Sequence, residues 1–232
     1  MPEIVCTIGP VSCDGPTFIE MTRAGMTMAR FNLSHNVLEW HRTAMREAKT
    51  AGIPVYVDIP GRKPRPWSTH RDDEAVAFAL ECGAEWFGFS YAETPEEVAE
   101  FKRMVPKTVA KIETELGLRN VYEIAGVADA LLLDRTDMAA SIGYWRLPEA
   151  QRLTILRGKA RGKPVYVASD ILHSMIYAPE PSAAEVMDAW SAIEQGATGL
   201  VLAGETAIGR YPVKAVWTLS AILATATQRR EV

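Results

Sequence analysis

The sequence predicts an α/β protein folded as a closed (β/α)₈ barrel, and three observations support this prediction. Short runs of β-branched and other apolar residues alternate with longer amphipathic segments along the whole chain. Strands that alternate with helices pair in parallel through right-handed crossovers. Eight such units fit within 232 residues, the length of a single TIM barrel. A doubly wound open sheet is the alternative, although it normally uses fewer strands.

The expected strands are short, mostly apolar runs bounded by turn residues. In chain order they are expected at residues 3–8, 28–32, 55–58, 86–90, 108–112, 130–133, 164–168 and 199–202.

The expected helices carry capping and termination signals. Gly25 and Gly52 follow amphipathic segments, where glycine commonly ends a helix. Ser182 and Glu185 have the spacing of a capping box. Helices are expected at residues 17–24, 38–51, 72–82, from 94 onward, 121–125, 147–160, 182–196 and 213–226.

The composition indicates a soluble globular protein. Hydrophobic residues make up 48% of the chain and charged residues 23%. The formal net charge of −4 offers no electrostatic basis for binding nucleic acid. Three cysteines without framework spacing favour a reducing compartment. No signal peptide or membrane-spanning run is visible, so a cytoplasmic protein with no membrane contact is expected.

Charged side chains follow several of the expected strands, at the end where (β/α)₈ barrels place their active sites. Lys111 and Glu113 are two residues apart on the fifth strand and therefore point the same way. Glu113 and Asp137 offer two carboxylates, which suit Mg²⁺ or Mn²⁺. Arg30 and Lys111 can neutralise a phosphate or a developing enolate oxygen.

Two further patterns point to ions or ligands at the same end. Asn32, Ser34 and Asp58 present oxygens without excess positive charge, as a monovalent cation such as K⁺ requires. The turn at residues 136–140 can begin a short helix whose N–H groups bind a carboxylate.

Seven motifs, in order along nearly the whole chain, resemble the pyruvate kinase family. They are CTIGPVS (6–12), AGMTMARFNLSH (24–35), AKIE (110–113), RTD (135–137), KPV (163–165), SMI (174–176) and GETA (204–207). The resemblance implies a TIM barrel of the type that binds pyruvate or phosphoenolpyruvate.

The resemblance also implies a role for each matching residue. Glu113 and Asp137 would hold the divalent ion, and Lys111 would balance the phosphoryl group or enolate oxygen. Ser169 stands where the family has a threonine implicated in enolate protonation. The catalytic set is then Lys111, Arg30 and Ser169. The substrate-binding set is Arg30, Arg135, Thr136, Asp137 and Ser169. The K⁺ set is Asn32, Ser34 and Asp58. Further candidates are Arg65, His35, Asp170 and His173.

The chain also departs from the family pattern. A single barrel domain is expected over residues 1–232, with no lid insertion after Arg65 and no C-terminal regulatory domain. Thr136 replaces a glycine at the carboxylate-binding turn, where its β-carbon could crowd the substrate. Other departures are Asp170 for glutamine, His173 for glutamate, Ala203 for serine and Ile208 for lysine.

These observations leave three functions open. The preferred hypothesis is a metal-dependent lyase, an aldolase or decarboxylase that acts on 2-oxo acids through an enolate. This hypothesis is preferred because the lid is missing while the enolate machinery is retained. The alternative is a minimal phosphotransferase that uses phosphoenolpyruvate and ADP, and the third is a non-catalytic barrel that binds a metabolite or partner. A second copy of the chain or a partner protein could cover the open mouth.

Overall fold

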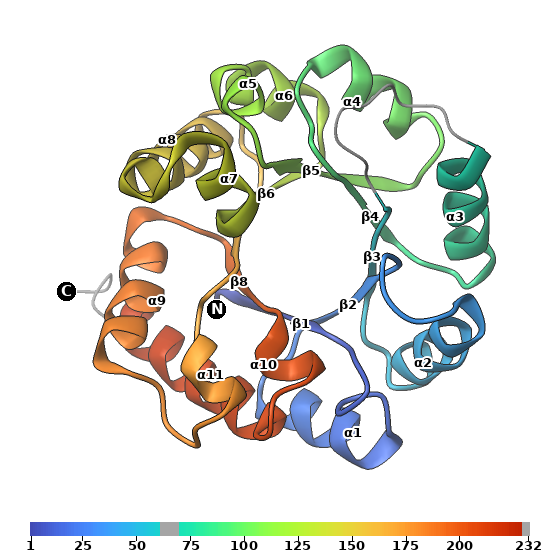
Figure 1. The fold of residues 1–232 in the computed structure, drawn as a ribbon, viewed down its shortest axis with the longest axis vertical. Helices are drawn as coiled ribbons and strands as arrows, with labels where there is room; N and C mark the ends of the chain where they lie inside the picture. Colours follow the sequence, from blue (N-terminus) through green and yellow to red (C-terminus); the bar gives the residue numbers. More distant parts are fainter. Residues whose placement is uncertain (61–69, 229–232) are drawn as a thin grey trace.

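The computed structural model describes residues 1–60 and 70–228, and within them eight parallel strands form a closed barrel (Figure 1). Each strand pairs with its neighbours in the sequence, and β8 closes the ring against β1. The closed ring excludes the doubly wound open sheet. The strands are β1 (Glu3–Thr7), β2 (Met28–Asn32), β3 (Val55–Asp58), β4 (Trp86–Phe89), β5 (Lys107–Ile112), β6 (Ala130–Asp134), β7 (Val165–Ala168) and β8 (Gly199–Leu202).

Helices surround the strands on the outside of the ring (Figure 1). The longer ones are α1 (Gly15–Ala24), α2 (Leu38–Thr50), α3 (His70–Glu81), α4 (Pro95–Lys102), α6 (Val121–Val127), α7 (Arg135–Ile142), α8 (Leu147–Ala160), α9 (Ala183–Gln195) and α11 (Pro212–Gln228). Shorter ones are α5 (Glu115–Arg119), α10 (Gly204–Ala207) and the 3₁₀ turns η1 (Tyr144–Arg146) and η2 (His173–Ile176).

The capping signals position the helices much as the sequence indicates. Ser182 and Glu185 form a reciprocal capping box at the start of α9. At α4, the Thr94 hydroxyl accepts the Glu97 backbone N–H at 3.3 Å. The sequence did not predict α5, α10, η1 or η2, because elements of so few residues have too few turns to show a helical period.

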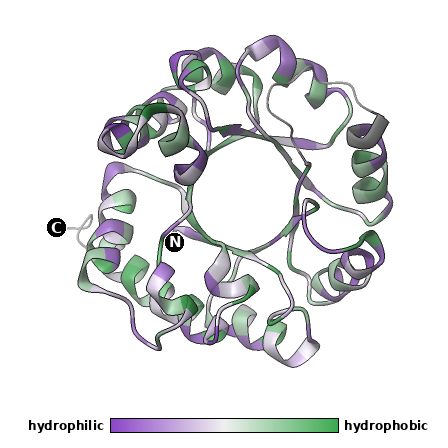
Figure 2. Ribbon diagram, viewed as in Figure 1, coloured by the Kyte–Doolittle hydropathy of each residue, from purple (hydrophilic) through white to green (hydrophobic). Residues whose placement is uncertain are grey.

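Two layers of apolar side chains stabilise the barrel. The larger layer lies between strands and helices and includes Phe31, Phe87 and Phe101, all fully buried. The smaller layer fills the inside of the ring. It consists of Val5, Met28, Tyr56, Val109, Ala130, Leu132, Tyr166, Ala168 and Val201, with Trp86 packed against it. Figure 2 shows hydrophobic residues along much of the strand ring, while the helices carry both hydrophobic and hydrophilic residues.

The interior changes from apolar to charged within a single step along several strands. On β5, Val109 belongs to the inner apolar layer, and Lys111 follows on the same face. On β6, Leu132 is followed in the same way by Asp134. The apolar layer therefore forms a floor beneath a ring of charged side chains at the carboxyl ends of the strands.

Two further features expected from the sequence concern membrane-spanning helices and the cysteines. Among the helices of the described ranges, none is both long and apolar enough to cross a membrane. Cys6, Cys13 and Cys82 are all free thiols. Burial raises the pKa of the Cys6 thiol well above its usual value, so this thiol is a core residue with little reactivity.

We predict that Gly158→Ala destabilises the protein by about 1–3 kcal/mol. A β-carbon at this position in α8 would lie 2.2 Å from Val165 Cγ2 on β7, and the β-branched valine cannot turn away without strain. Urea unfolding monitored by circular dichroism measures the change.

Gly126→Ala in α6 is the matched control. Its β-carbon would meet only Arg161, at 3.6 Å or beyond, and alanine favours the helix by about 0.5–1 kcal/mol. Equal stability changes in the two variants would contradict the close packing of α8 on β7.

Candidate active site at the carboxyl ends of the strands

A buried ion pair joins β2 to β3 at the mouth of the barrel. Arg30 Nε donates to Asp58 Oδ2 at 2.9 Å, and Nη2 contacts the same oxygen. Arg30 Nη1 donates to Thr7 Oγ1 at 2.7 Å, and the Tyr56 hydroxyl donates to Asp58 Oδ1 at 2.5 Å. Burial alone would raise the pKa of Asp58, but the charges of Arg30 and Lys111 outweigh it and lower the pKa to about 2. Both partners are therefore charged at neutral pH.

Lys111 is a buried cation held between two carboxylates. Its Nζ lies 3.0 Å from Glu113 Oε1 and 3.6 Å from Asp58 Oδ2, and its side chain is 8% exposed. Burial lowers the pKa of Lys111, but Asp58 and Glu113 more than offset this and raise it above its usual value. The ammonium group is therefore charged and fixed in place, as a group that neutralises a substrate oxygen must be.

Glu113 is almost completely buried beside this lysine. Its Oε2 accepts the backbone N–H of Tyr91 at 2.5 Å, and Tyr91 has a left-handed φ of 53°. Burial raises the pKa of Glu113 to about 7, with Lys111 opposing the rise and Asp134 adding to it. A carboxylate that is costly to ionise in isolation is well suited to a site where a cation compensates its charge.

Three carboxylates converge next to Lys111. Glu113, Asp134 and Asp137 each offer an oxygen within 4.8 Å of the others. The Tyr91 hydroxyl lies 3.4 Å from Asp137 Oδ1. Carboxylate oxygens are the donors that Mg²⁺ and Mn²⁺ prefer, so the residues present fit a divalent cation. The predicted ligands Glu113 and Asp137 therefore lie together, and Asp134 joins them.

Ser169 contacts the same cluster through Asp134. Its hydroxyl donates to Asp134 Oδ1 at 2.7 Å. Ser169 and Asp170 follow β7 with positive φ values of 75° and 54°, a conformation that costs free energy for residues other than glycine. The surrounding structure must therefore hold this pair in place.

Arg135 stabilises Ser169 and Asp170 through hydrogen bonds to their carbonyls. Its Nε and Nη2 donate to the Ser169 carbonyl at 2.9 and 2.5 Å, and Nη2 also donates to the Asp170 carbonyl at 3.0 Å. Its Nη1 donates to Asp188 of α9 at 2.6 Å. The guanidinium expected to bind substrate is thus engaged with the β7 loop. In this structure Arg135 positions Ser169.

Two of the expected K⁺ ligands, Asn32 and Asp58, are paired on neighbouring strands, but their side chains have other partners. Asn32 Oδ1 accepts the backbone N–H of Ser34 at 3.0 Å, and both oxygens of Asp58 accept hydrogen bonds as described above. A K⁺ ion bound there would have to share Asp58 with Arg30. His35 is exposed, and its carbonyl accepts from His41 Nε2 at 2.7 Å.

The remaining candidates divide between the mouth and its rim. Thr136 and Asp137 lie in the first turn of α7, as the 136–140 turn predicted. His173 Nδ1 lies 3.1 Å from Asp170 Oδ1, and both side chains are more than half exposed. This pair is on the exposed rim of the mouth. Arg65 lies outside the described residues.

Sequence reasoning missed three contributors to the site. Asp134 ends β6, and its alternation with Leu132 already directs it inward. Tyr56 precedes Asp58 by two residues on the same face, which was a readable signal. Tyr91 adopts a left-handed conformation and contributes mainly through its backbone N–H. No sequence pattern indicated this contact.

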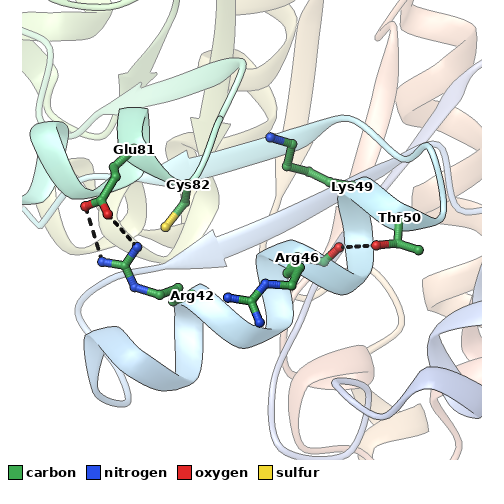
Figure 3. Close-up of a pocket in the computed structure, with 6 residues that line it drawn as sticks. All are labelled: Arg42, Arg46, Lys49, Thr50, Glu81 and Cys82. Carbon is green, nitrogen blue, oxygen red and sulfur yellow. Dashed lines mark hydrogen bonds and ion pairs between the residues drawn. The ribbon is translucent and has the colours of Figure 1, made fainter.

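A separate pocket of 390 Å³ lies between α2 and α3 (Figure 3). Arg42 of α2 donates to the two carboxylate oxygens of Glu81 of α3 at 2.8 and 3.2 Å. The Thr50 hydroxyl donates to the Arg46 carbonyl at 2.9 Å. Lys49 and Cys82 complete the lining. The pocket is on the outer wall and contains none of the predicted site residues.

Comparison with known proteins identifies similar barrels. The family model described as "Pyruvate kinase, barrel domain" matches residues 1–55 and 55–216. The pyruvate kinase of Thermotoga maritima is 36% identical over 169 residues, covering 70% of this chain and 36% of that protein. The pyruvate kinase of Aeropyrum pernix is 33% identical over 228 residues, covering 92% and 50%. That of Methylorubrum extorquens is 34% identical over 162 residues, covering 68% and 34%. The chain spans between a third and a half of the length of these relatives.

The comparisons overturn the lyase prediction. The relatives are named for a phosphotransferase, and none of the observations at the mouth requires a different reaction class. The prediction was wrong because it gave the missing lid more weight than the retained residues. The phosphotransferase alternative is the better interpretation of the same side chains.

We predict that the Arg30–Asp58–Lys111 cluster makes the protein less stable in acid. Because the folded-state pKa of Asp58 is lowered, to about 2, the unfolded chain binds more protons than the folded one as pH falls below about 4. The free energy of unfolding should therefore fall through this window, with a contribution of about 1 kcal/mol lost by pH 3. Urea unfolding at several pH values measures the slope. Asp58→Asn should lack this component, and an identical slope in that variant would contradict the assignment.

We predict that Arg135→Lys destabilises the protein by about 2 kcal/mol. Lysine retains the charge but cannot reach the Ser169 carbonyl, the Asp170 carbonyl and Asp188 together. Arg152→Lys on the exposed face of α8 is the matched control and should change stability by less than about 0.5 kcal/mol. Urea unfolding compares the two, and equal effects would show that Arg135 does not hold the strained β7 loop.

Proposed function

Because this chain belongs to the pyruvate kinase family, we propose that it is a phosphotransferase barrel that transfers the phosphoryl group of phosphoenolpyruvate to ADP. In this reaction the phosphorus–oxygen bond of phosphoenolpyruvate breaks and a new one forms to the β-phosphate of ADP. The enolate left behind takes a proton at its methylene carbon and becomes pyruvate. The observation that carries the proposal is the buried Lys111 ammonium beside the carboxylate cluster of Glu113 and Asp137.

Lys111 and Arg30 supply the positive charge that phosphoryl transfer requires. Both are buried, so their fields are weakly screened by water. Glu113 and Asp137 would hold Mg²⁺ or Mn²⁺, which supplies further positive charge to the substrate oxygens. K⁺ is proposed as a second ion on the resemblance alone, at Asn32, Ser34 and Asp58.

The start of α7 is proposed to bind the substrate carboxylate. Asp134 is the N-cap residue of this eight-residue helix, but its side chain makes no capping hydrogen bond. The first-turn N–H groups near Thr136 and Asp137 are thus left uncapped by Asp134, and a helix N-terminus attracts an anion. Ser169, fixed by Asp134 and Arg135, is proposed to stand where the enolate is protonated.

The lack of an inserted lid between β3 and α3 is part of the proposal. The two matched segments of the family model adjoin at Val55, the first residue of β3, and only residues 59–69 connect β3 to α3. We propose that the barrel works without an inserted lid between these elements. Whatever covers the substrate then comes from outside this connection.

We predict that pyruvate forms from phosphoenolpyruvate only when ADP is present, in a buffer containing Mg²⁺ and K⁺. Pyruvate and ATP are followed together by NMR, so that simple hydrolysis of phosphoenolpyruvate is distinguished from transfer. Pyruvate formed at the same rate without ADP, or no reaction under any of these conditions, would contradict the proposed function.

Lys111→Met should lower kcat by at least about 100-fold, because removing a preorganised charge from the transition state has an effect of this size. Lys107→Met is the matched control. Lys107 lies on the same strand at its opposite, exposed end, with its Nζ 4.6 Å from the Trp86 ring. Equal losses in both variants would contradict the role of Lys111.

A further inference from the structure

Asp134 is the one carboxylate of the cluster that the proposed function does not assign to the cation. It is the last residue of β6 and directly precedes α7. At the N-cap position an aspartate side chain normally accepts a backbone N–H of its own helix. Asp134 makes no such bond. Its side chain lies instead among Glu113, Asp137 and Ser169.

We infer that Asp134 is a third ligand of the divalent cation and joins that cation to the hydroxyl of Ser169. The inference rests on the proposed function, because it assumes the cation that Glu113 and Asp137 would hold. It adds a ligand to that pair. It also gives Ser169 a positioning partner within the same cluster.

The separations support three-carboxylate binding. The three offered oxygens lie within 4.8 Å of one another. In an octahedral Mg²⁺ or Mn²⁺ site, adjacent ligand oxygens lie about 3 Å apart and opposite ones about 4 Å apart. Only small side-chain movements therefore separate the described arrangement from a coordinating one.

The charges in the mouth support the same conclusion. Two cationic and four anionic side chains meet there, a net charge of −2 when all are ionised: Arg30, Lys111, Asp58, Glu113, Asp134 and Asp137. The guanidinium of Arg135 does not alter this balance, because it is bound to the β7 loop and to Asp188. A divalent cation neutralises the excess, and without Asp134 half of that excess would be gone.

The hydrogen bond to Ser169 gives Asp134 its second role. Asp134 Oδ1 accepts the Ser169 hydroxyl at 2.7 Å, which leaves its other oxygen for the cation. The bond holds the Ser169 hydroxyl in a fixed position beside this carboxylate. Asp134 thereby fixes both the cation and the hydroxyl proposed to act at the enolate carbon.

Manganese binding to the whole chain, with no substrate present, tests this inference. Free Mn²⁺ is measured by electron paramagnetic resonance at one mildly alkaline pH. Asp134→Asn should weaken Mn²⁺ binding by at least about tenfold. Ser169→Ala should leave the affinity within about threefold, because it removes only a hydroxyl. Asp73→Asn, which removes the same charge from the exposed surface of α3, should do likewise.

The outcomes separate this inference from the proposed function. An unchanged affinity in Asp134→Asn, with binding lost in Glu113→Gln, would overturn the inference and leave the two-ligand site standing. Equal weakening in Asp134→Asn and Ser169→Ala would also overturn it. No Mn²⁺ binding by the unaltered chain would overturn both. Tight, Asp134-dependent binding without phosphoryl transfer would support the inference while the proposed function fails.

The melting temperature gives an independent reading. Without metal, Asp134→Asn should be at least as stable as the unaltered chain, because it removes one of three mutually repelling carboxylates. The rise in melting temperature on adding Mn²⁺ should be smaller in the variant. An equal rise in both proteins would contradict the third-ligand role.

Discussion

The structure of the barrel mouth depends on one buried cation, Lys111, whose charge is neutralised by neighbouring carboxylates. Lys111 sits 3.0 Å from Glu113 and 3.6 Å from Asp58, and a buried ammonium without such partners would be strongly unfavourable. Asp58 in turn pairs with Arg30. This chain of charges links β2, β3 and β5. It keeps both cations ionised at the carboxyl ends of the strands.

A second set of contacts stabilises two residues whose left-handed backbone conformation costs free energy. Tyr91 and Ser169 both adopt left-handed φ values immediately beyond strands. A bond from the Tyr91 N–H to Glu113 holds one, and Arg135 holds the other through the Ser169 carbonyl. Strain at such positions persists only where surrounding contacts enforce it. The same residues that bear charge thus shape the loops, so a substitution at Arg135 is expected to act on Ser169.

The sequence predicted the barrel well because alternating strands and helices leave few topologies, and eight units favour closure. It placed Lys111, Glu113 and Asp137 together because strand alternation and barrel topology both direct them to one mouth. For Arg135, predicted to bind substrate, the sequence did not reveal that the guanidinium donates to the β7 loop. No local pattern distinguishes a side chain that faces substrate from one that faces a carbonyl. The sequence also did not show whether the missing lid or the retained charged residues should decide the reaction class. The lyase hypothesis, which followed from the missing lid, was therefore wrong.

The central claim is that the mouth of the barrel holds a divalent cation and an anionic substrate beside Lys111. A crystal structure of the chain grown with Mn²⁺ and phosphoenolpyruvate, with anomalous diffraction data, tests it most directly. The account predicts an anomalous peak about 2.1 Å from oxygens of Glu113, Asp134 and Asp137, with a substrate oxygen within hydrogen-bonding distance of Lys111 Nζ. A peak elsewhere, or a substrate bound away from Lys111, would contradict it.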